Sequence, residues 1–157
     1  MESDYAEEIR DWLDRGDWSN WFAVTLTMRR TIVSESGECS FISIDRASQN
    51  LRHFLNVMNS KIFGNAYKRF NKRVKVIPVY EQDGDTHLHF HLFIEKPDRL
   101  SDLRFESLIR TNWIKSDWGL WSMKIRKDTD SGWLEYITKD TRASFENVDF
   151  ENLWITD

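Results

Sequence analysis

The chain has one cysteine among its 157 residues, and this scarcity excludes several classes of protein. Cys39 has no partner cysteine for an internal disulfide, so a reducing compartment is expected. The sequence also contains no Cys-x-x-Cys pair. That absence excludes cysteine-based zinc sites, including the paired-cysteine signature of the zinc deaminases.

The chain also lacks an apolar run of the roughly 20 residues that a membrane-spanning helix needs. Its first residues, Met1 to Asp4, are acidic and lack the basic and apolar regions of a signal peptide. Hydrophobic residues make up 40% and charged residues 31%, a balance typical of a globular protein. We therefore expect one domain over residues 1–157, in the cytoplasm of its host cell and with no membrane partner.

The chain has fewer basic than acidic residues, 22 against 26, but its positive charge is concentrated locally. The formal net charge of −4 argues against a nucleic-acid partner. Residues 59–80, however, contain no acidic residue, and they include Lys61, Lys68, Arg69, Lys72, Arg73 and Lys75. This run is either a solvated helix end or a surface that contacts phosphates. We predict phosphate contacts by Lys68, Arg69, Lys72 and Arg73, and by Arg29 and Arg30 after the first expected strand.

Histidine is also rare, yet three of the four histidines lie in one short segment. His87, His89 and His91 alternate with large apolar residues, which is the period-two pattern of a half-buried strand. Their imidazoles are therefore expected on one face of that strand and the apolar side chains on the other. Three imidazoles on one face predict a metal site.

A carboxylate can join this set if the preceding turn has the right length. Glu81 lies eight residues before His89. Directly opposed residues of an antiparallel hairpin share a face. A two-residue loop would oppose Glu81 to Thr86, on the wrong face. A three-residue loop with a bulge would oppose it to His87, on the histidine face.

One carboxylate and two imidazoles suit Mn²⁺ or Mg²⁺ and leave coordination positions open. We predict Glu81, His89 and His91 as the ligands, with His87 as an alternative ligand. The same two-histidine, one-carboxylate set would also suit Fe²⁺ in an oxygenase.

A second motif follows about 45 residues later. Tyr136 and Lys139 are three residues apart and therefore share one face of an expected helix over about 130–142. A phenol has a pKa of about 10, so it is a poor nucleophile unless a cation and an activated phosphate assist it. Phenolate is a fair leaving group for the same reason, so a phosphotyrosine ester would allow religation.

Hydrophobic periodicity predicts the order of the other elements. Strands are expected over 20–28, 73–81, 86–95 and 121–125. Helices are expected over the first 18 residues, from Asp45 to Gly64, and from Ser101 or Asp102 with Leu103, Leu108, Ile109 and Trp113 facing inward. This β-α-β-β-α-β order, followed by the tyrosine helix, predicts an α+β fold with a ferredoxin-like or RRM-like antiparallel sheet.

These motifs together resemble those of a known superfamily. His89-Phe90-His91 resembles the His-hydrophobe-His motif of the HUH endonucleases, the rolling-circle replication initiators and relaxases. Glu81 resembles the third ligand of the small viral and plasmid initiators, and the segment from Tyr136 to Asp140 resembles their Tyr-x-x-Lys motif. The segment from Phe22 to Thr27 resembles their first strand. The motifs follow the order of that superfamily across residues 20–142.

The resemblance implies a one-tyrosine enzyme that nicks and rejoins single-stranded origin DNA, presented as a hairpin or an exposed strand. Tyr136 would attack the scissile phosphate, form a 5′-phosphotyrosine link and free a 3′-OH primer. A Mn²⁺ or Mg²⁺ ion would neutralise charge on the phosphate, and Lys139 would contact the phosphate or help to place the metal. A phage, plasmid or virus would encode such a protein, and in a eukaryotic host it would act in the nucleus.

The chain departs from many viral members of the superfamily in one respect. It contains no Gly-x-x-x-x-Gly-Lys-Ser/Thr loop, so a separate helicase of the host or the element is the expected partner. Two other functions remain open. One is an RRM-like module that binds single strands without catalysis, although its strands lack the paired aromatics of such modules. The other is a two-histidine, one-carboxylate metalloenzyme, which would more often be built on a double-sheet barrel.

Overall fold

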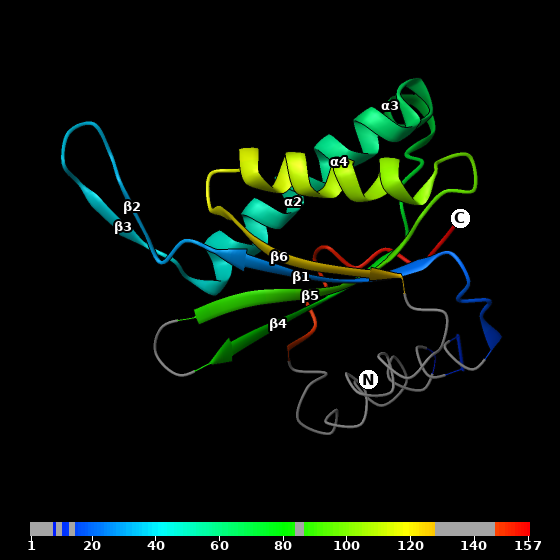
Figure 1. The fold of residues 1–157 in the computed structure, drawn as a ribbon, viewed down its shortest axis with the longest axis horizontal. Helices are drawn as coiled ribbons and strands as arrows, with labels where there is room; N and C mark the ends of the chain where they lie inside the picture. The colour runs from blue at the N-terminus through cyan, green and yellow to red at the C-terminus, as the bar shows by residue number, and fades with distance from the viewer. Residues whose placement is uncertain (1–7, 9–10, 13–14, 84–86, 128–146) are drawn as a thin grey trace.

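The computed structural model describes residues 8, 11–12, 15–83, 87–127 and 147–157 (Figure 1). Its elements, in chain order, are β1 (Trp21–Met28), β2 (Thr31–Val33), β3 (Cys39–Phe41), α2 (Ile44–Phe63), α3 (Asn65–Phe70), β4 (Val76–Asp83), β5 (His87–Glu95), α4 (Asp102–Lys115) and β6 (Gly119–Lys127). The expected tyrosine helix over about 130–142 lies outside the described residues, as does most of the expected N-terminal helix.

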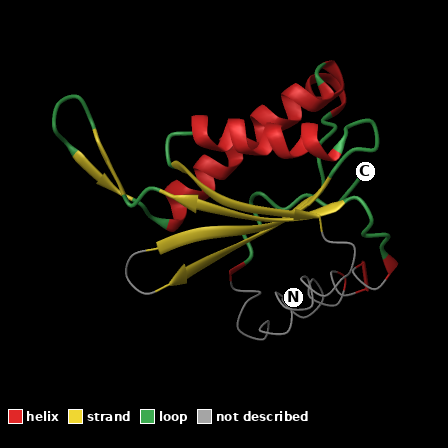
Figure 2. Cartoon of the chain, in the orientation of Figure 1, coloured by secondary structure: helices red, strands yellow, loops and turns green. Residues whose placement is uncertain are grey.

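Four strands form one antiparallel sheet in the order β4-β5-β1-β6. Helices α2 and α4 lie together on one face of it (Figures 1 and 2). The short strands β2 and β3 pair only with each other, and this ribbon projects away from the body of the molecule (Figure 1). These observations confirm the predicted α+β class and the antiparallel sheet. None of the described helices is long and apolar enough to cross a membrane.

The helix α2 follows from local signals in the sequence. Its N-cap is Ser43, whose hydroxyl accepts a hydrogen bond from the backbone N–H of Arg46, so the helix begins one residue before the predicted Asp45. It ends at Gly64, as predicted. Gly64 has a φ of 53°, a conformation that glycine adopts without steric cost.

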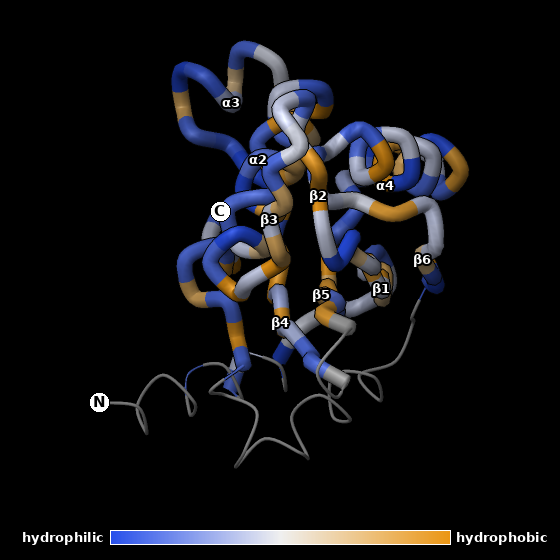
Figure 3. Tube along the Cα trace, turned by 90° about the vertical axis from the view of Figure 1, so that its left-hand side faces the viewer, coloured by the Kyte–Doolittle hydropathy of each residue, from blue (hydrophilic) through white to orange (hydrophobic). Residues whose placement is uncertain are grey.

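The main core lies between the helices and the sheet. Residues on the helix-facing side of β5, such as Leu92, are fully buried there against Phe54 and Met58 of α2 and Trp113 of α4. Figure 3 shows the hydrophobic segments, in orange, gathered along the strands and on the helices that cover them. Because successive side chains of a strand point to opposite faces, the residues between these apolar ones lie on the face away from the helices.

A second, smaller cluster covers one end of that opposite face. Trp21 of β1 stacks on Phe93 of β5 with ring centroids 4.7 Å apart, and Trp18 packs edge-on against Trp21. Val148, which follows the undescribed segment, belongs to the same cluster and bridges to Val79 of β4. The other end of this face carries polar side chains.

Three expectations about the elements were wrong in detail. Leu103 does not face the core, because its side chain is 81% exposed and Phe105 is buried in its place. In a helix with 3.6 residues per turn, Phe105, Leu108 and Ile109 share a face from which Leu103 is turned away. The strand that was expected to begin at Arg73 is β4, which begins at Val76. The last strand, β6, extends over Gly119–Lys127 instead of stopping at Ile125.

Candidate metal and nucleic-acid site

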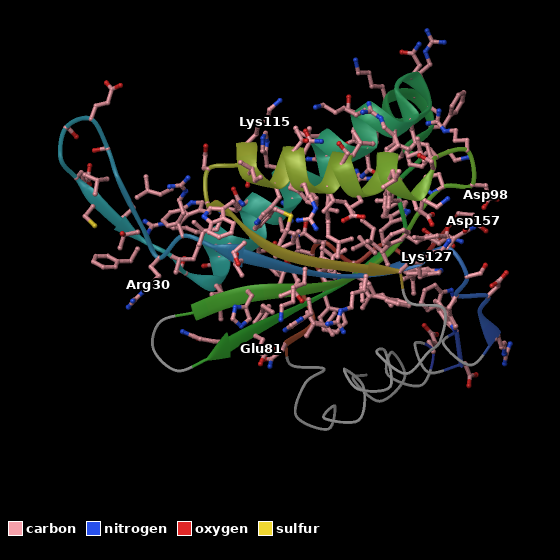
Figure 4. The ribbon with its side chains drawn as sticks, viewed as in Figure 1. Arg30, Glu81, Asp98, Lys115, Lys127 and Asp157 are labelled. Atoms are coloured by element: carbon pink, nitrogen blue, oxygen red, sulfur yellow. The ribbon has the colours of Figure 1, made fainter. Side chains whose placement is uncertain are left out.

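The β4–β5 hairpin places Glu81 directly opposite His89. Asp83 pairs with His87, so three residues, 84–86, connect the two strands. The sequence predicted a three-residue connection that would oppose Glu81 to His87. The turn lies one residue later, and the partner therefore shifts by two residues while the shared face is kept. Glu81 and His89 consequently lie on the face away from the helices (Figure 4).

His91 is held at both ring nitrogens. Its Nε2 lies 2.5 Å from Oε2 of Glu81, and its Nδ1 lies 3.3 Å from the hydroxyl of Thr25 on β1. The side chains of His91 and Glu81 are 23% and 50% exposed, so solvent and ligands can reach the pair. A short contact between an imidazole and a carboxylate orients the ring and keeps the carboxylate beside it.

His89 completes the set of candidate ligands on this face. Its ring centroid lies 5.9 Å from that of His91, at an interplanar angle of 75°. Two imidazoles bound to one ion at about 2.1 Å would have centroids roughly 4.6–6.5 Å apart. The spacing of these two rings therefore fits a shared metal ion.

The three side chains are not arranged as a ready metal cage. Among the described residues, no three histidine, cysteine, aspartate or glutamate side chains converge as a metal site. Glu81 and His91 contact each other at 2.5 Å, whereas two ligand atoms of one ion are about 3 Å apart at bond lengths near 2.1 Å. One carboxylate and two imidazoles are nevertheless a donor set of the kind that suits Mn²⁺ or Mg²⁺. The backbone of His87 pairs with Asp83 at the end of β5.

Two cations share the histidine face of the sheet. Thr25 pairs with His91 on one side and with Lys124 of β6 on the other, so the three side chains lie in one row across the sheet. Arg126 lies two residues further along the same face of β6. Both Lys124 and Arg126 are exposed. Positive charge therefore lies on the same face as the carboxylate–histidine pair, separated from His91 by β1, on an exposed surface.

Tyr136 and Lys139 lie outside the described residues. The chain leaves the described part after Lys127, at the end of β6, and returns at Asn147. Val148 then bridges to Val79, which is itself the partner of His91 in the sheet. The described chain thus resumes beside the row of residues that contains His91.

The predicted basic run lies at the other end of the molecule. It occupies α3 and the residues after it, with Lys68, Arg69, Lys72 and Arg73 all described. Arg73 packs over the rings of Tyr67 and Trp154, at 5.4 and 5.0 Å from their centroids. At about 3.4 Å per residue, Val76 and Glu81 are about 17 Å apart along β4. The structure therefore does not bring this run next to the histidines.

Arg29 and Arg30 lie nearer to the site. Both are exposed and directly follow β1. Arg30 lies at the base of the β2–β3 ribbon, at the same end of the sheet as Glu81 (Figure 4). The sequence placed these two arginines after the first strand, and no expected element included the strands β2 and β3.

Thr25 was not among the predicted site residues. The signal for it lay in β1, where Thr25 and Thr27 alternate with the buried Val24, Leu26 and Met28. Such alternation places both hydroxyls on the polar face of the sheet.

No family model, curated protein or solved structure matches this chain.

Proposed function

We propose that this chain is a metal-dependent endonuclease of the HUH type, which nicks and rejoins single-stranded DNA through a covalent 5′-phosphotyrosine and initiates rolling-circle replication. One observation carries the proposal. Glu81 stands opposite His89 and contacts His91, so the carboxylate and two imidazoles of the predicted ligand set share one solvent-accessible face. A separate helicase and single-stranded origin DNA remain its proposed partners.

The topology supports the same proposal. We interpret the order β4-β5-β1-β6, with α2 and α4 as the two crossover helices, as a ferredoxin-like sheet. The β2–β3 ribbon is then an insertion between the first strand and the first helix. The proposal adds a C-terminal helix with Tyr136 on the histidine face.

In the proposed reaction, the oxygen of Tyr136 forms a bond to the scissile phosphorus, and the bond from phosphorus to the 3′ oxygen breaks. The leaving 3′ oxygen gains a proton and becomes the free 3′-OH, while the phenol loses its own proton. Rejoining reverses both changes, and phenolate leaves because its pKa is only about 10. Lys139 would bind a phosphate oxygen.

The described residues would bind the metal ion and the phosphates of the DNA. Glu81, His89 and His91 would hold Mn²⁺ or Mg²⁺, and that ion would supply positive charge to the phosphate oxygens. The Thr25 hydroxyl fixes the ring of His91 from the opposite nitrogen, so His91 keeps one orientation. Lys124 would bind a neighbouring phosphate of the strand.

The test is a denaturing gel after incubation with Mn²⁺ and a random-sequence library of single-stranded DNA, which removes the need to know the origin sequence. We expect a protein–DNA adduct that survives denaturation and disappears when a chelator is present. His89→Ala and His91→Ala should abolish the adduct. His53→Ala is the matched control, because His53 is the remaining histidine and is exposed on α2.

Three outcomes would contradict the proposal. Binding without any adduct would favour a non-catalytic single-strand binder, and no interaction with DNA would favour a different metalloenzyme. Full adduct formation by the double variant His89→Ala, His91→Ala would show that these histidines do not hold the metal.

A further inference from the structure

A hollow lies close to the candidate site but on the helix side of the sheet. It is located where the base of the β2–β3 ribbon meets the start of α2 and the β4–β5 hairpin, and its volume is about 660 Å³. Its lining includes Arg30, Phe41, Ile44, Gln82 and Leu88. This volume is within the range of small-ligand pockets, about 300–1,000 Å³.

The aromatic ring that lines this hollow, Phe41, is mostly exposed to solvent. Phe41 is 65% exposed and Ile44 is 44% exposed, although both are large apolar side chains. An exposed phenyl ring is a stacking platform for a nucleobase, because every base has a flat face of similar size.

Arg30 and Phe41 are both held at the base of the ribbon. Thr31 pairs with Phe41, and the next residue, Ile42, donates its N–H to the carbonyl of Arg30 at 2.9 Å. The guanidinium of Arg46 donates to the carbonyl of Phe41 from α2 and anchors the ribbon to the body. Arg30 and Phe41 therefore line the same hollow, which offers one cation and one aromatic ring to a nucleotide.

Charge along the ribbon directs an anion to its base rather than its tip. The tip carries Glu35 and Glu38, whereas the base carries Arg29, Arg30 and Arg46. A polyanion is repelled from the tip and attracted to the base. A partner that bound the whole ribbon would have to accommodate negative charge at the tip and positive charge at the base.

The hollow is also next to the candidate site along the chain. Gln82 follows Glu81, and Leu88 precedes His89, so the two sites lie on opposite faces of the same hairpin end. The exposed amide of Gln82 can both donate to and accept from a base edge.

We propose that this hollow binds one base of the single-stranded DNA, stacked on Phe41 with its phosphate on Arg30, while the adjoining strand crosses the end of the β4–β5 hairpin to the Glu81–His91 pair. The assignment rests on the proposed function for its choice of ligand. It adds a positioning site that lies outside the metal ligands and the tyrosine motif.

Photo-crosslinking tests the assignment without requiring cleavage. An oligothymidine strand with iodouracil in place of thymine is irradiated with the full chain, and the linked peptide is identified by mass spectrometry. We expect the link on the peptide that contains Phe41. A link only on Phe70 or Trp121, which are more exposed aromatics, would overturn the proposal.

Binding affinity gives an independent test. Phe41→Ala should weaken binding of oligothymidine by about fivefold to about a hundredfold, the range expected for loss of one stacked base. Phe41→Trp should retain wild-type affinity, which distinguishes stacking from a general structural role. Phe150→Ala is the matched control, since Phe150 is a similarly exposed aromatic. Equal affinity of Phe41→Ala and the wild type would refute the base site.

The endonuclease proposal and the base-site proposal can be refuted independently of each other. A crosslink at Phe41 without any covalent adduct would keep the base site and refute the endonuclease. An adduct that forms with no crosslink at Phe41 and no loss of affinity in Phe41→Ala would refute the base site and keep the endonuclease.

Discussion

Replacing Lys124 and Arg126 together with alanine is expected to weaken binding of single-stranded DNA and to flatten its salt dependence. Each phosphate contact to a single strand contributes about 0.7 to the slope of log affinity against log salt concentration, so the loss of two contacts lowers the slope by about 1.4. Between about 50 and 200 mM salt, that change corresponds to roughly a sevenfold difference in affinity. Both side chains are exposed on β6, so the fold should tolerate the change.

The measurement is the fluorescence anisotropy of a labelled oligothymidine strand over a series of salt concentrations. The matched control replaces Lys68 and Arg69, which are also exposed and remove the same charge from α3. The sequence predicts phosphate contacts by Lys68 and Arg69, but the structure does not bring α3 next to the histidines, so we expect this variant to keep a slope close to that of the wild type. If the control flattens the slope and the β6 variant does not, the basic run on α3 binds the phosphates, and the reasoning from the shared sheet face is wrong.

Three further predictions concern the framework of the site. Asp149→Ala should lower the free energy of unfolding by about 1–3 kcal/mol in urea denaturation, because the buried carboxylate accepts a 2.8 Å hydrogen bond from Ser48; an unchanged midpoint would contradict this. Gly119→Ala should reduce the melting temperature clearly, since an added Cβ would lie 1.9 Å from the carbonyl oxygen of Trp113, and a wild-type melt would refute that packing. Burial raises the pKa of the Glu95 carboxyl above its ordinary value of 4.5, so stability should fall as pH rises from 4.5 through the raised pKa. Glu95→Gln should remove that part of the pH dependence, and an identical stability–pH curve would count against it.

The sequence predicted the elements whose side chains alternate with a clear period. The alternation of His89, Phe90 and His91 correctly indicated a strand with one apolar face. The spacing of Leu51, Phe54 and Met58 likewise predicts one buried face for α2, and all three side chains are buried. Such patterns survive folding because burial of each apolar side chain contributes to the same core.

The sequence could not predict features that depend on turn geometry or on weak packing. The shift of Glu81 from His87 to His89 follows from where the turn begins, which composition alone did not settle. The β2–β3 ribbon has strands of three residues and exposes Val33 and Phe41, so no periodic burial marks it. The first of these features positions the candidate site.

Contacts within the site were also beyond the sequence. The pattern placed Glu81 and the histidines on one face, but the direct contact of Glu81 with His91 depends on side-chain conformation. The sequence also did not indicate where Lys124 lies relative to the histidines. Its place next to Thr25 depends on the pairing of β6 with β1.

The most direct test of the account is to map the covalent link in the protein–DNA adduct. The chain is incubated with Mn²⁺ and the single-stranded library, the DNA is digested, and the modified peptide is sequenced by mass spectrometry. We predict a nucleotide on Tyr136 and no adduct from Tyr136→Phe, which retains the ring and lacks only the hydroxyl. A nucleotide on Tyr5, Tyr67 or Tyr80, or an undiminished adduct from Tyr136→Phe, would contradict this prediction.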